Sequence, residues 1–143
     1  MDDALRTSLE HAAVGGRTFE PAPRWHFLFL ENRDILQDLL RLLPGSEAAE
    51  DVTNAVAAFS GRSAADAADA CAGLNRMFAA AGDTGCRFSE ELLRVFSGTH
   101  AQSLKEALGV PSDYMCIGAI VFGENVSPAE PEAVKWDIFS YMK

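Results

Sequence analysis

A helix-to-strand junction late in the sequence constrains the fold of this chain more than any other segment. Residues 107–114 read Ala-Leu-Gly-Val-Pro-Ser-Asp-Tyr and lead into an apolar segment over 115–123. Gly109 favours the end of a helix, and Pro111 cannot continue one. An apolar run bounded by such residues and ending on glycine is typical of a buried strand. We therefore expect a helix that ends at Gly109 and passes directly into a core strand.

Helical and strand-like segments alternate along the rest of the chain. Apolar residues at helical spacing predict helices over 3–13, from Asn32 or Asp34 to Leu43, from Ser63 or Asp66 to Ala81, and over 90–96. Apolar runs predict strands over 25–30, 55–59 and 114–122, with 134–141 as a further candidate. Thr99 and Gln102 match the capping-box pattern ahead of the helix that Gly109 ends.

This alternation predicts an α+β class, of the three-layer α/β type, with a single small sheet. The 143 residues correspond to a single domain over 1–143 and are enough to bury a core.

The charge of the chain bears on its partners. Its 12 Lys and Arg stand against 21 Asp and Glu, a formal net charge of -9, and the basic residues form no cluster. We therefore expect no nucleic-acid partner and no anionic membrane surface. The apolar runs are far shorter than the roughly 20 residues of a membrane-spanning helix. The acidic opening, Met1-Asp2-Asp3, differs from a secretory signal, so we expect a cytoplasmic protein.

The residue types that carry catalysis or bind metals form no recognisable group in the sequence. Three cysteines lack the C-x-x-C spacing, and three histidines lie far apart without paired spacing. Reduced thiols and no metal site are the interpretation that we favour. The sequence shows no G-x-S-x-G motif and no Ser-His-Asp grouping, so we predict no catalytic side chain.

Three segments in the same order resemble the nitroreductase-like flavoproteins. That family closes its fold with a similar A-L-G-(I/V)-P-x-D-Y segment and an apolar strand ending in glycine, as over 107–123. The helix over 3–13 reaches Trp25 and the strand over 27–30 in a similar order, and residues 80–87 (AAGDTGCR) are similar to the end of the family's long central helix. The resemblance implies a nitroreductase-like fold and an intertwined homodimer with FMN bound between subunits.

The resemblance also implies which residues would bind FMN. Gly16, Arg17 and Thr18 form a possible phosphate cradle, because glycine lets the backbone approach an anion and the other two supply donors. Lys135 lies where the family often places a basic phosphate ligand, and Thr84 and Gly85 would line the flavin ring.

Each of these residues also has a purely structural interpretation. Gly15-Gly16 would be a helix C-cap, Lys135 a solvated lysine, and Thr84-Gly85 a helix-to-loop turn. Trp25 is either a stacking surface for a small aromatic ligand or a core residue.

The chain also departs from the family pattern. The family's R-x-S-x-R motif, whose arginines engage the cofactor phosphate, is only partly matched at Arg6-Thr7-Ser8, and Glu10 stands at the second arginine. We interpret this segment as the family's second helix and expect the usual first helix to be lacking. Pro21 and Pro23 stand where the family has Asn and Gln, and proline offers no side-chain hydrogen bond.

Three functional hypotheses follow. The first is an FMN-dependent oxidoreductase that resembles nitroreductases and passes electrons from NAD(P)H to a nitro or quinone-type acceptor. The second is a degenerate, non-catalytic module that keeps the fold for binding or dimerisation. The third is a small acidic α/β domain without flavin. Retention of flavin by the purified protein discriminates the first from the others.

Overall fold

The computed structural model describes residues 1–16, 22–43, 52–82, 84–123, 140 and 142. Within these residues helices and strands alternate as expected. Their bounds are α1 (Asp3–Val14), β1 (Trp25–Leu30), α2 (Arg33–Leu40), β2 (Asn54–Ser60), α3 (Ala64–Ala81), β3 (Cys86–Phe88), α4 (Glu90–Val95), α5 (Ala101–Leu108) and β4 (Met115–Phe122). Among the helices of this described part, none is long and apolar enough to cross a membrane.

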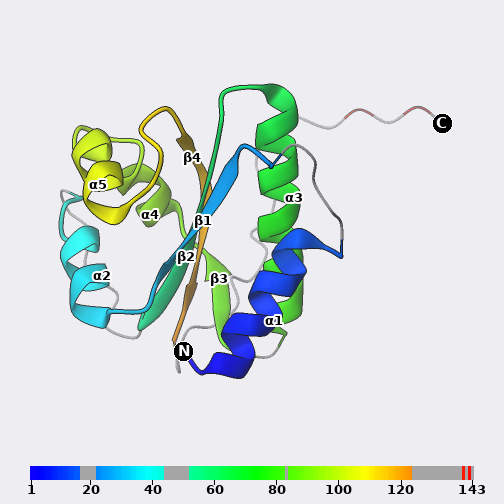
Figure 1. Cartoon of the computed structure of the whole chain (residues 1–143). Coiled ribbons are helices and arrows are strands. Elements are labelled where there is room, and N and C mark those ends of the chain that lie inside the picture. The colour runs from blue at the N-terminus through cyan, green and yellow to red at the C-terminus, as the bar shows by residue number, and fades with distance from the viewer. Residues whose placement is uncertain (17–21, 44–51, 83, 124–139, 141, 143) are drawn as a thin grey trace.

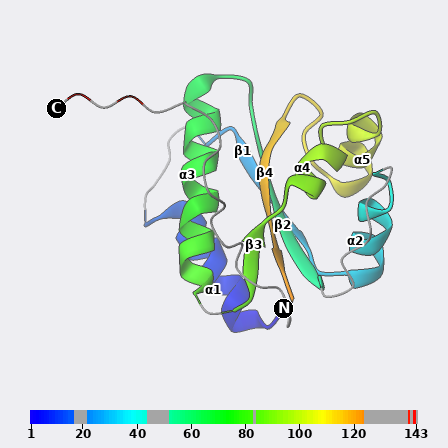
Figure 2. The same ribbon diagram turned by 180° about the vertical axis from the view of Figure 1, so that it is seen from behind.

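The strands form one antiparallel sheet in the order β1-β2-β4-β3. Helices α1 and α3 cover one face of this sheet, and α2, α4 and α5 cover the other (Figure 1). Figure 2 shows the same separation from behind. The predicted α+β class with a three-layer arrangement and a single small sheet is therefore confirmed.

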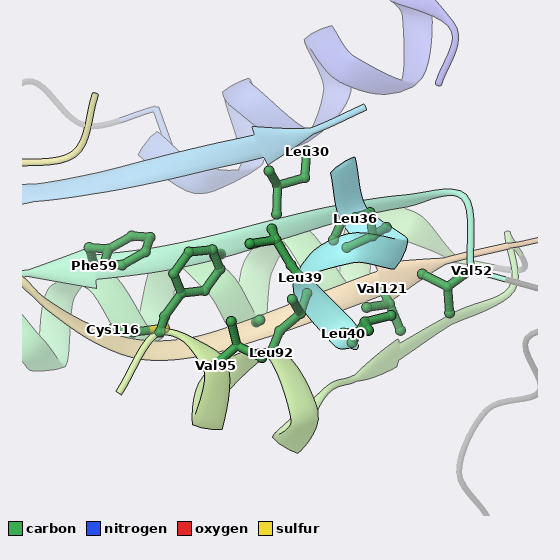
Figure 3. Close-up of a cluster of buried hydrophobic side chains, with 14 of the residues drawn as sticks. Leu30, Leu36, Leu39, Leu40, Val52, Phe59, Leu92, Val95, Cys116 and Val121 are labelled. Carbon is green, nitrogen blue, oxygen red and sulfur yellow. The ribbon is translucent and has the colours of Figure 1, made fainter. Parts of the chain in front are cut away.

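The alternation of side chains along the central strands creates a core on each face. From β2, Ala55, Ala57 and Phe59 join the cluster beneath α2 and α4, and Val56 and Ala58 join the cluster beneath α1 and α3. Figure 3 shows the first cluster, in which leucines of α2 and α4 meet residues of β2 and β4 over the sheet. This arrangement explains why an alanine-rich segment is a strand, since helices pack closely on both of its faces.

A β-bulge in β4 brings α3 close to the sheet. The register shifts between Ala58 and Phe59, which pair with Gly118 and Cys116, so Ile117 is the extra residue. A Cβ added at Gly118 would lie 2.9 Å from Cδ2 of Leu74 on α3. The glycine is therefore the residue that allows this close packing.

The helix starts follow the sequence signals, with one exception. Of the alternatives, Asn32 caps α2 and Ser63 caps α3, and Ser89 caps α4. The capping box expected at Thr99 is wrong. Helix α5 has His100 at its N-cap position, without a side-chain capping hydrogen bond.

Two further elements, the end of α2 and strand β3, differ from what the sequence pattern predicts. Helix α2 ends at Leu40 and not at Leu43. Arg41 is its C-cap, and residues 41–43 form a turn and a bend instead of helix. Strand β3 was not expected, and it exists because Cys86–Phe88 pairs with the end of β4. The strand expected over 134–141 lies, apart from residue 140, outside the described residues.

Candidate functional site

Gly15 and Gly16 end α1 and carry the described part of the predicted phosphate cradle. Gly15 has a φ of 67°, and its N–H donates a 3.0 Å hydrogen bond to the carbonyl of His11, so this glycine is the C-cap of α1. Gly16 has a φ of 70°, and an added Cβ would meet no atom of the described residues within 4 Å. Among the described residues, nothing therefore fills the position that a side chain at Gly16 would take.

An arginine from α3 lies directly against this end of α1. Arg76 donates from Nε to the carbonyl of Ala12 at 2.8 Å and from Nη2 to the carbonyl of Ala13 at 2.6 Å. A Cβ added at Gly15 would lie 2.9 Å from Arg76 Nε, so the glycine also makes room for the guanidinium. Carbonyls at a helix C-terminus lack helical partners and carry negative potential, and Arg76 compensates both effects here.

The other cradle residues and the tail lysine are not described. Arg17, Thr18 and Lys135 lie outside the described residues, as do Pro21 and the candidate strand around Lys135. Their roles in binding a cofactor therefore stay predictions.

Thr84 and Gly85 belong to the turn that joins α3 to β3. The Thr84 hydroxyl donates to the carbonyl of Ala81 at 2.6 Å, and the backbone N–H of Thr84 donates to the same oxygen at 3.1 Å. The Gly85 carbonyl accepts a 3.2 Å hydrogen bond from the N–H of Gly123. These contacts match the turn interpretation, although the hydroxyl oxygen can still accept a hydrogen bond.

The structure does not bring Gly16 and Thr84 together within one chain. Arg76, which touches the end of α1, lies six residues before the end of α3 at Gly82. At 1.5 Å per residue this places the Thr84 turn roughly 9 Å further along the helix axis. Figure 1 shows that α1 ends beside the middle of α3, whereas β3 follows the C-terminal end of α3.

A charged cluster at the other end of α3 was not anticipated from the sequence. Arg24, just before β1, lies between two carboxylates, with Nη2 2.8 Å from Asp113 Oδ2 and Nε 3.8 Å from Asp66 Oδ2. Its guanidinium carbon lies 5.7 Å from the ring centre of Tyr114. We call these four residues the Arg24 cluster. With two carboxylates against one guanidinium, the cluster does not offer Arg24 to a phosphate.

The first strand supplies the aromatic residue that was considered for stacking. Trp25 is half-buried and meets Phe27 edge to face, with ring centres 5.3 Å apart and an interplanar angle of 74°. An edge-to-face pair on a half-buried strand is typical of aromatic packing. The structure therefore favours the packing role for this tryptophan.

The cysteines differ in exposure. Burial raises the pKa of the Cys86 thiol and of the Cys116 thiol to about 11 each, whereas Cys71 is exposed on α3. The two buried thiols are therefore protonated and unreactive at neutral pH. In the described part of the chain, no group of three His, Cys, Asp or Glu side chains could hold a metal ion.

A surface cavity of about 470 Å³ lies along α2, away from the predicted site. Its described lining is polar and comes from this helix and its C-cap: Arg33, Asp34, Gln37, Asp38 and Arg41. Helix α2 packs on the face of the sheet opposite to α1 and α3 (Figure 2). The cavity is thus not formed by any of the described residues that were predicted to bind a cofactor.

Comparison with known proteins supports the fold. No protein-family model matches the chain, and no curated protein sequence matches it. Solved structures do match. A nitroreductase with bound FMN from Desulfitobacterium hafniense DCB-2 aligns with a TM-score of 0.71 at 16% identity, over 100% of this chain and 88% of that chain.

Two further solved structures agree. A nitroreductase with bound FMN from Bacteroides fragilis NCTC 9343 has a TM-score of 0.68 at 14% identity, over 100% of this chain and 89% of that chain. An FMN-dependent nitroreductase from Clostridium difficile R20291 has a TM-score of 0.66 at 12% identity, over 100% of this chain and 89% of that chain. Identities this low establish the fold alone. The chain therefore has the nitroreductase-like fold that the sequence resemblance implied.

Proposed function

We propose that this protein is an FMN-dependent oxidoreductase that transfers electrons from NAD(P)H to a nitro or quinone-type acceptor. The observation that carries the proposal is the alignment of the whole chain with structures that contain bound FMN, at a TM-score of up to 0.71 among those described above. Bound flavin would supply the redox chemistry, and the protein would bind and orient it. The proposal therefore does not require a catalytic side chain, and the sequence predicts none.

Two features of the described residues support this cofactor at one end of the proposed site. No described atom fills the Cβ direction of Gly16, and Arg76 offsets the negative end of α1 beside it. A phosphate of about two negative charges also needs donors of its own, which Arg17 and Thr18 would supply. We propose that Gly16, Arg17 and Thr18 hold the phosphate, with Lys135 as a further cation, and that Thr84 and Gly85 lie near the ring.

We propose a homodimer, as the family resemblance implies, in which residues of two subunits would complete one flavin site. We propose that residues 1–143 form a single domain that assembles in this way. Sedimentation equilibrium at micromolar concentration tests the assembly. A monomer would count against this proposal and against a dimerisation module alike.

A non-catalytic module is the second candidate, and three contacts favour it. Arg24 is neutralised by Asp66 and Asp113, and the Thr84 hydroxyl is engaged at the end of α3. Together with a net charge of -9, these contacts reduce the attraction for an anionic cofactor.

Flavin retention discriminates these two candidates. The visible absorption spectrum of protein purified without added cofactor should show flavin bands, or gain them after incubation with FMN and desalting. Near-stoichiometric bands support the oxidoreductase. If neither sample retains flavin, the proposal fails and the non-catalytic module is the better account.

A further inference from the structure

We propose that residues 97–114, which contain α5 and lead into β4, form a lid that opens by local unfolding as one cooperative unit, with Arg24 as its latch. The proposal goes beyond the proposed function and does not depend on bound flavin. It rests on how little of this segment is buried, on the hydrogen bonds within it, and on its contact with Arg24.

Most of the segment lies at the surface of the protein. Of residues 97–114, Lys105 and Val110 are the two that are buried, and one of them is charged. Residues 97–100 are all exposed, and so is Met115, directly after the segment. Few buried apolar contacts are typical of regions that open with a free energy below that of global unfolding. Both ends of the segment lie where a bend in the backbone displaces no buried side chain.

Helix α5 lacks two features that would stabilise it on its own. It has eight residues, whereas an isolated helix needs roughly 12–15 to be even marginally stable. Its N-cap residue, His100, makes no side-chain capping hydrogen bond to the first N–H groups of the helix. The helix therefore depends on its packing against the sheet and on the loop that follows it, and it unfolds when the segment leaves the sheet.

Hydrogen bonds within the segment tie the helix to that loop. The Lys105 ammonium donates to the carbonyl of Ser112 at 3.1 Å and to the carbonyl of Tyr114 at 2.8 Å. The N–H of Val110 donates to the Lys105 carbonyl at 2.9 Å. These bonds join α5 to its own loop and not to the sheet. Helix and loop therefore form and open together.

Arg24 joins the segment to the rest of the protein. Its Nη2 lies 2.8 Å from Asp113 Oδ2, and its guanidinium carbon lies 5.7 Å from the ring centre of Tyr114. Arg24 is itself held from behind, because the N–H of Gly61 donates a 2.8 Å hydrogen bond to its carbonyl and Asp66 Oδ2 lies 3.8 Å from its Nε. The side chains of Arg24 and Asp113 are 58% and 62% exposed, so their ion pair is weak and breaks reversibly.

The lid covers part of the core on the α2 and α4 side of the sheet. Leu104, Leu108 and Tyr114 are partly buried and pack against the cluster that contains Cys116. Figures 1 and 2 both place α5 next to α4 on this side. Opening of the lid would expose apolar surface of this cluster and the thiol within it. The cluster on the other face, which contains Cys86, would stay covered.

Amide hydrogen exchange tests whether the segment opens as one unit. The N–H groups of Leu104, Val110 and Tyr114 donate to carbonyls within the segment. We expect them to share one protection factor, at least about tenfold lower than those of the hydrogen-bonded amides of β2. Arg24→Met should lower all three by the same factor, about threefold as for an exposed ion pair, and leave the β2 amides unchanged.

Two further variants complete this experiment. Asp113→Asn removes the same ion pair from the lid and should act in the same direction as Arg24→Met. The matched control is Arg41→Met, which removes an arginine whose exposed partner is Asp38, at the C-terminal end of α2. It should leave the protection factors of the segment unchanged.

The two buried thiols report which side of the sheet opens. Both have a pKa raised to about 11 by burial, so their ionisation does not distinguish them. In a Cys71→Ser background, Arg24→Met should raise the rate at which a thiol reagent modifies Cys116 about threefold and leave the rate at Cys86 unchanged. Mass spectrometry of the digested protein measures each rate. Equal acceleration at both thiols would show that Arg24 supports the whole fold and is not a latch.

The exchange data would overturn the proposal in three ways. If the amides of the segment are as well protected as those of β2, the segment opens only when the whole protein unfolds. Widely different protection factors among Leu104, Val110 and Tyr114 would contradict a single unit. An effect of Arg24→Met no larger than that of Arg41→Met would show that Arg24 is not the latch. None of these outcomes involves flavin, so the lid is tested separately from the proposed function.

Discussion

The ammonium group of Lys105 donates a 2.8 Å hydrogen bond to the backbone carbonyl of Tyr114, across the junction between α5 and β4. The same nitrogen donates to the carbonyl of Ser112 at 3.1 Å, and the side chain is buried. A lysine in the last turn of α5 thus folds the following loop back onto its own helix. The loop carries Asp113, so this contact also supports the Arg24 cluster.

We expect Lys105→Met to destabilise the protein by about 2 kcal/mol, because two carbonyls in partly buried hydrogen bonds lose a charged donor. Urea unfolding followed by circular dichroism measures this change. Arg62→Met, which removes an exposed cation at the start of α3, should change the free energy of unfolding by less than about 0.5 kcal/mol. Equal effects of the two substitutions would show that the Lys105 contacts do not stabilise the junction.

Gly73 marks the closest approach between α1, α3 and β1. A Cβ at this position would lie 2.8 Å from Cζ of Phe27 and 3.0 Å from the carbonyl oxygen of Ala13. Alanine favours a helix by about 1 kcal/mol over glycine, but overpacking of a core costs about 1–3 kcal/mol. We expect Gly73→Ala to destabilise the protein by about 1 kcal/mol, since the Ala13 carbonyl is held by Arg76 and cannot move away.

A double-mutant cycle identifies the clash as the cause. In a Phe27→Leu background the Cζ atom is absent, so Gly73→Ala should cost less than it does in the wild type. Urea unfolding of the four proteins gives the coupling free energy. An identical cost in both backgrounds would contradict the role assigned to the Phe27 ring.

The sequence predicted those helices and strands that are long enough to show a hydrophobic pattern. The spacing over α3 and the run of apolar residues in β2 are visible without tertiary information, even though alanine prefers helices. Strand β3 has only the residues Cys86–Phe88, which are too few to show alternation, and β4 makes it a strand by pairing with it. The β-bulge at Ile117 has no local sequence signal either, because it arises from the pairing of β4 with β2.

The candidate site was predictable only where its contacts are local. The C-cap role of Gly15 follows from its place after a helix, and the turn role of Thr84 follows from the three residues around it. The Arg76 contact joins residues 64 positions apart, and the Arg24–Asp113 pair joins residues 89 positions apart. Such contacts depend on how α1, α3 and the sheet pack, which the sequence pattern does not contain.

The thiols should differ sharply in reactivity. Cys71 is exposed, whereas burial raises the pKa of Cys86 and of Cys116 to about 11, so about one thiol in a thousand is ionised at pH 8 at each buried position. We expect one fast-reacting thiol per chain with a chromogenic disulfide reagent under native conditions. Cys71→Ser should abolish the fast phase, and its persistence would mean that a buried cysteine is accessible.

The same burial predicts a loss of stability at alkaline pH. The pKa of Cys116 rises from its ordinary 9.0 to about 11 in the folded protein, so above pH 9.0 the folded chain keeps a proton that the unfolded chain releases. The contribution of the Cys116 thiol to the free energy of unfolding is therefore complete below pH 9.0 and is lost as the pH rises toward 11.

Urea unfolding across this pH range measures that loss. Cys116→Ala should show a shallower decline in the free energy of unfolding than the wild type, with Cys71→Ala as the control for removing an exposed thiol. Parallel curves for Cys116→Ala and the wild type would contradict the assignment.

The role proposed for Arg17 and Lys135 predicts a difference between two flavins. Both residues are proposed to contact the phosphate, which FMN carries and riboflavin lacks. Arg17→Ala and Lys135→Ala should therefore weaken FMN binding by about tenfold or more, as expected for the loss of a charge-assisted hydrogen bond, and leave riboflavin binding nearly unchanged. Titration followed by the quenching of flavin fluorescence measures both affinities.

A surface arginine from the opposite layer provides the control for net charge. Arg41→Ala, at the residue just after α2, lowers the charge of the protein by the same amount, and Arg41 pairs with the exposed Asp38. This substitution should weaken FMN binding only slightly, and less so at higher salt, because distant charges are screened. Equal losses for FMN and riboflavin in Arg17→Ala would show that the arginine does not contact the phosphate but supports the fold of the binding segment. Losses no larger than that of Arg41→Ala would mean that net charge alone explains the effect.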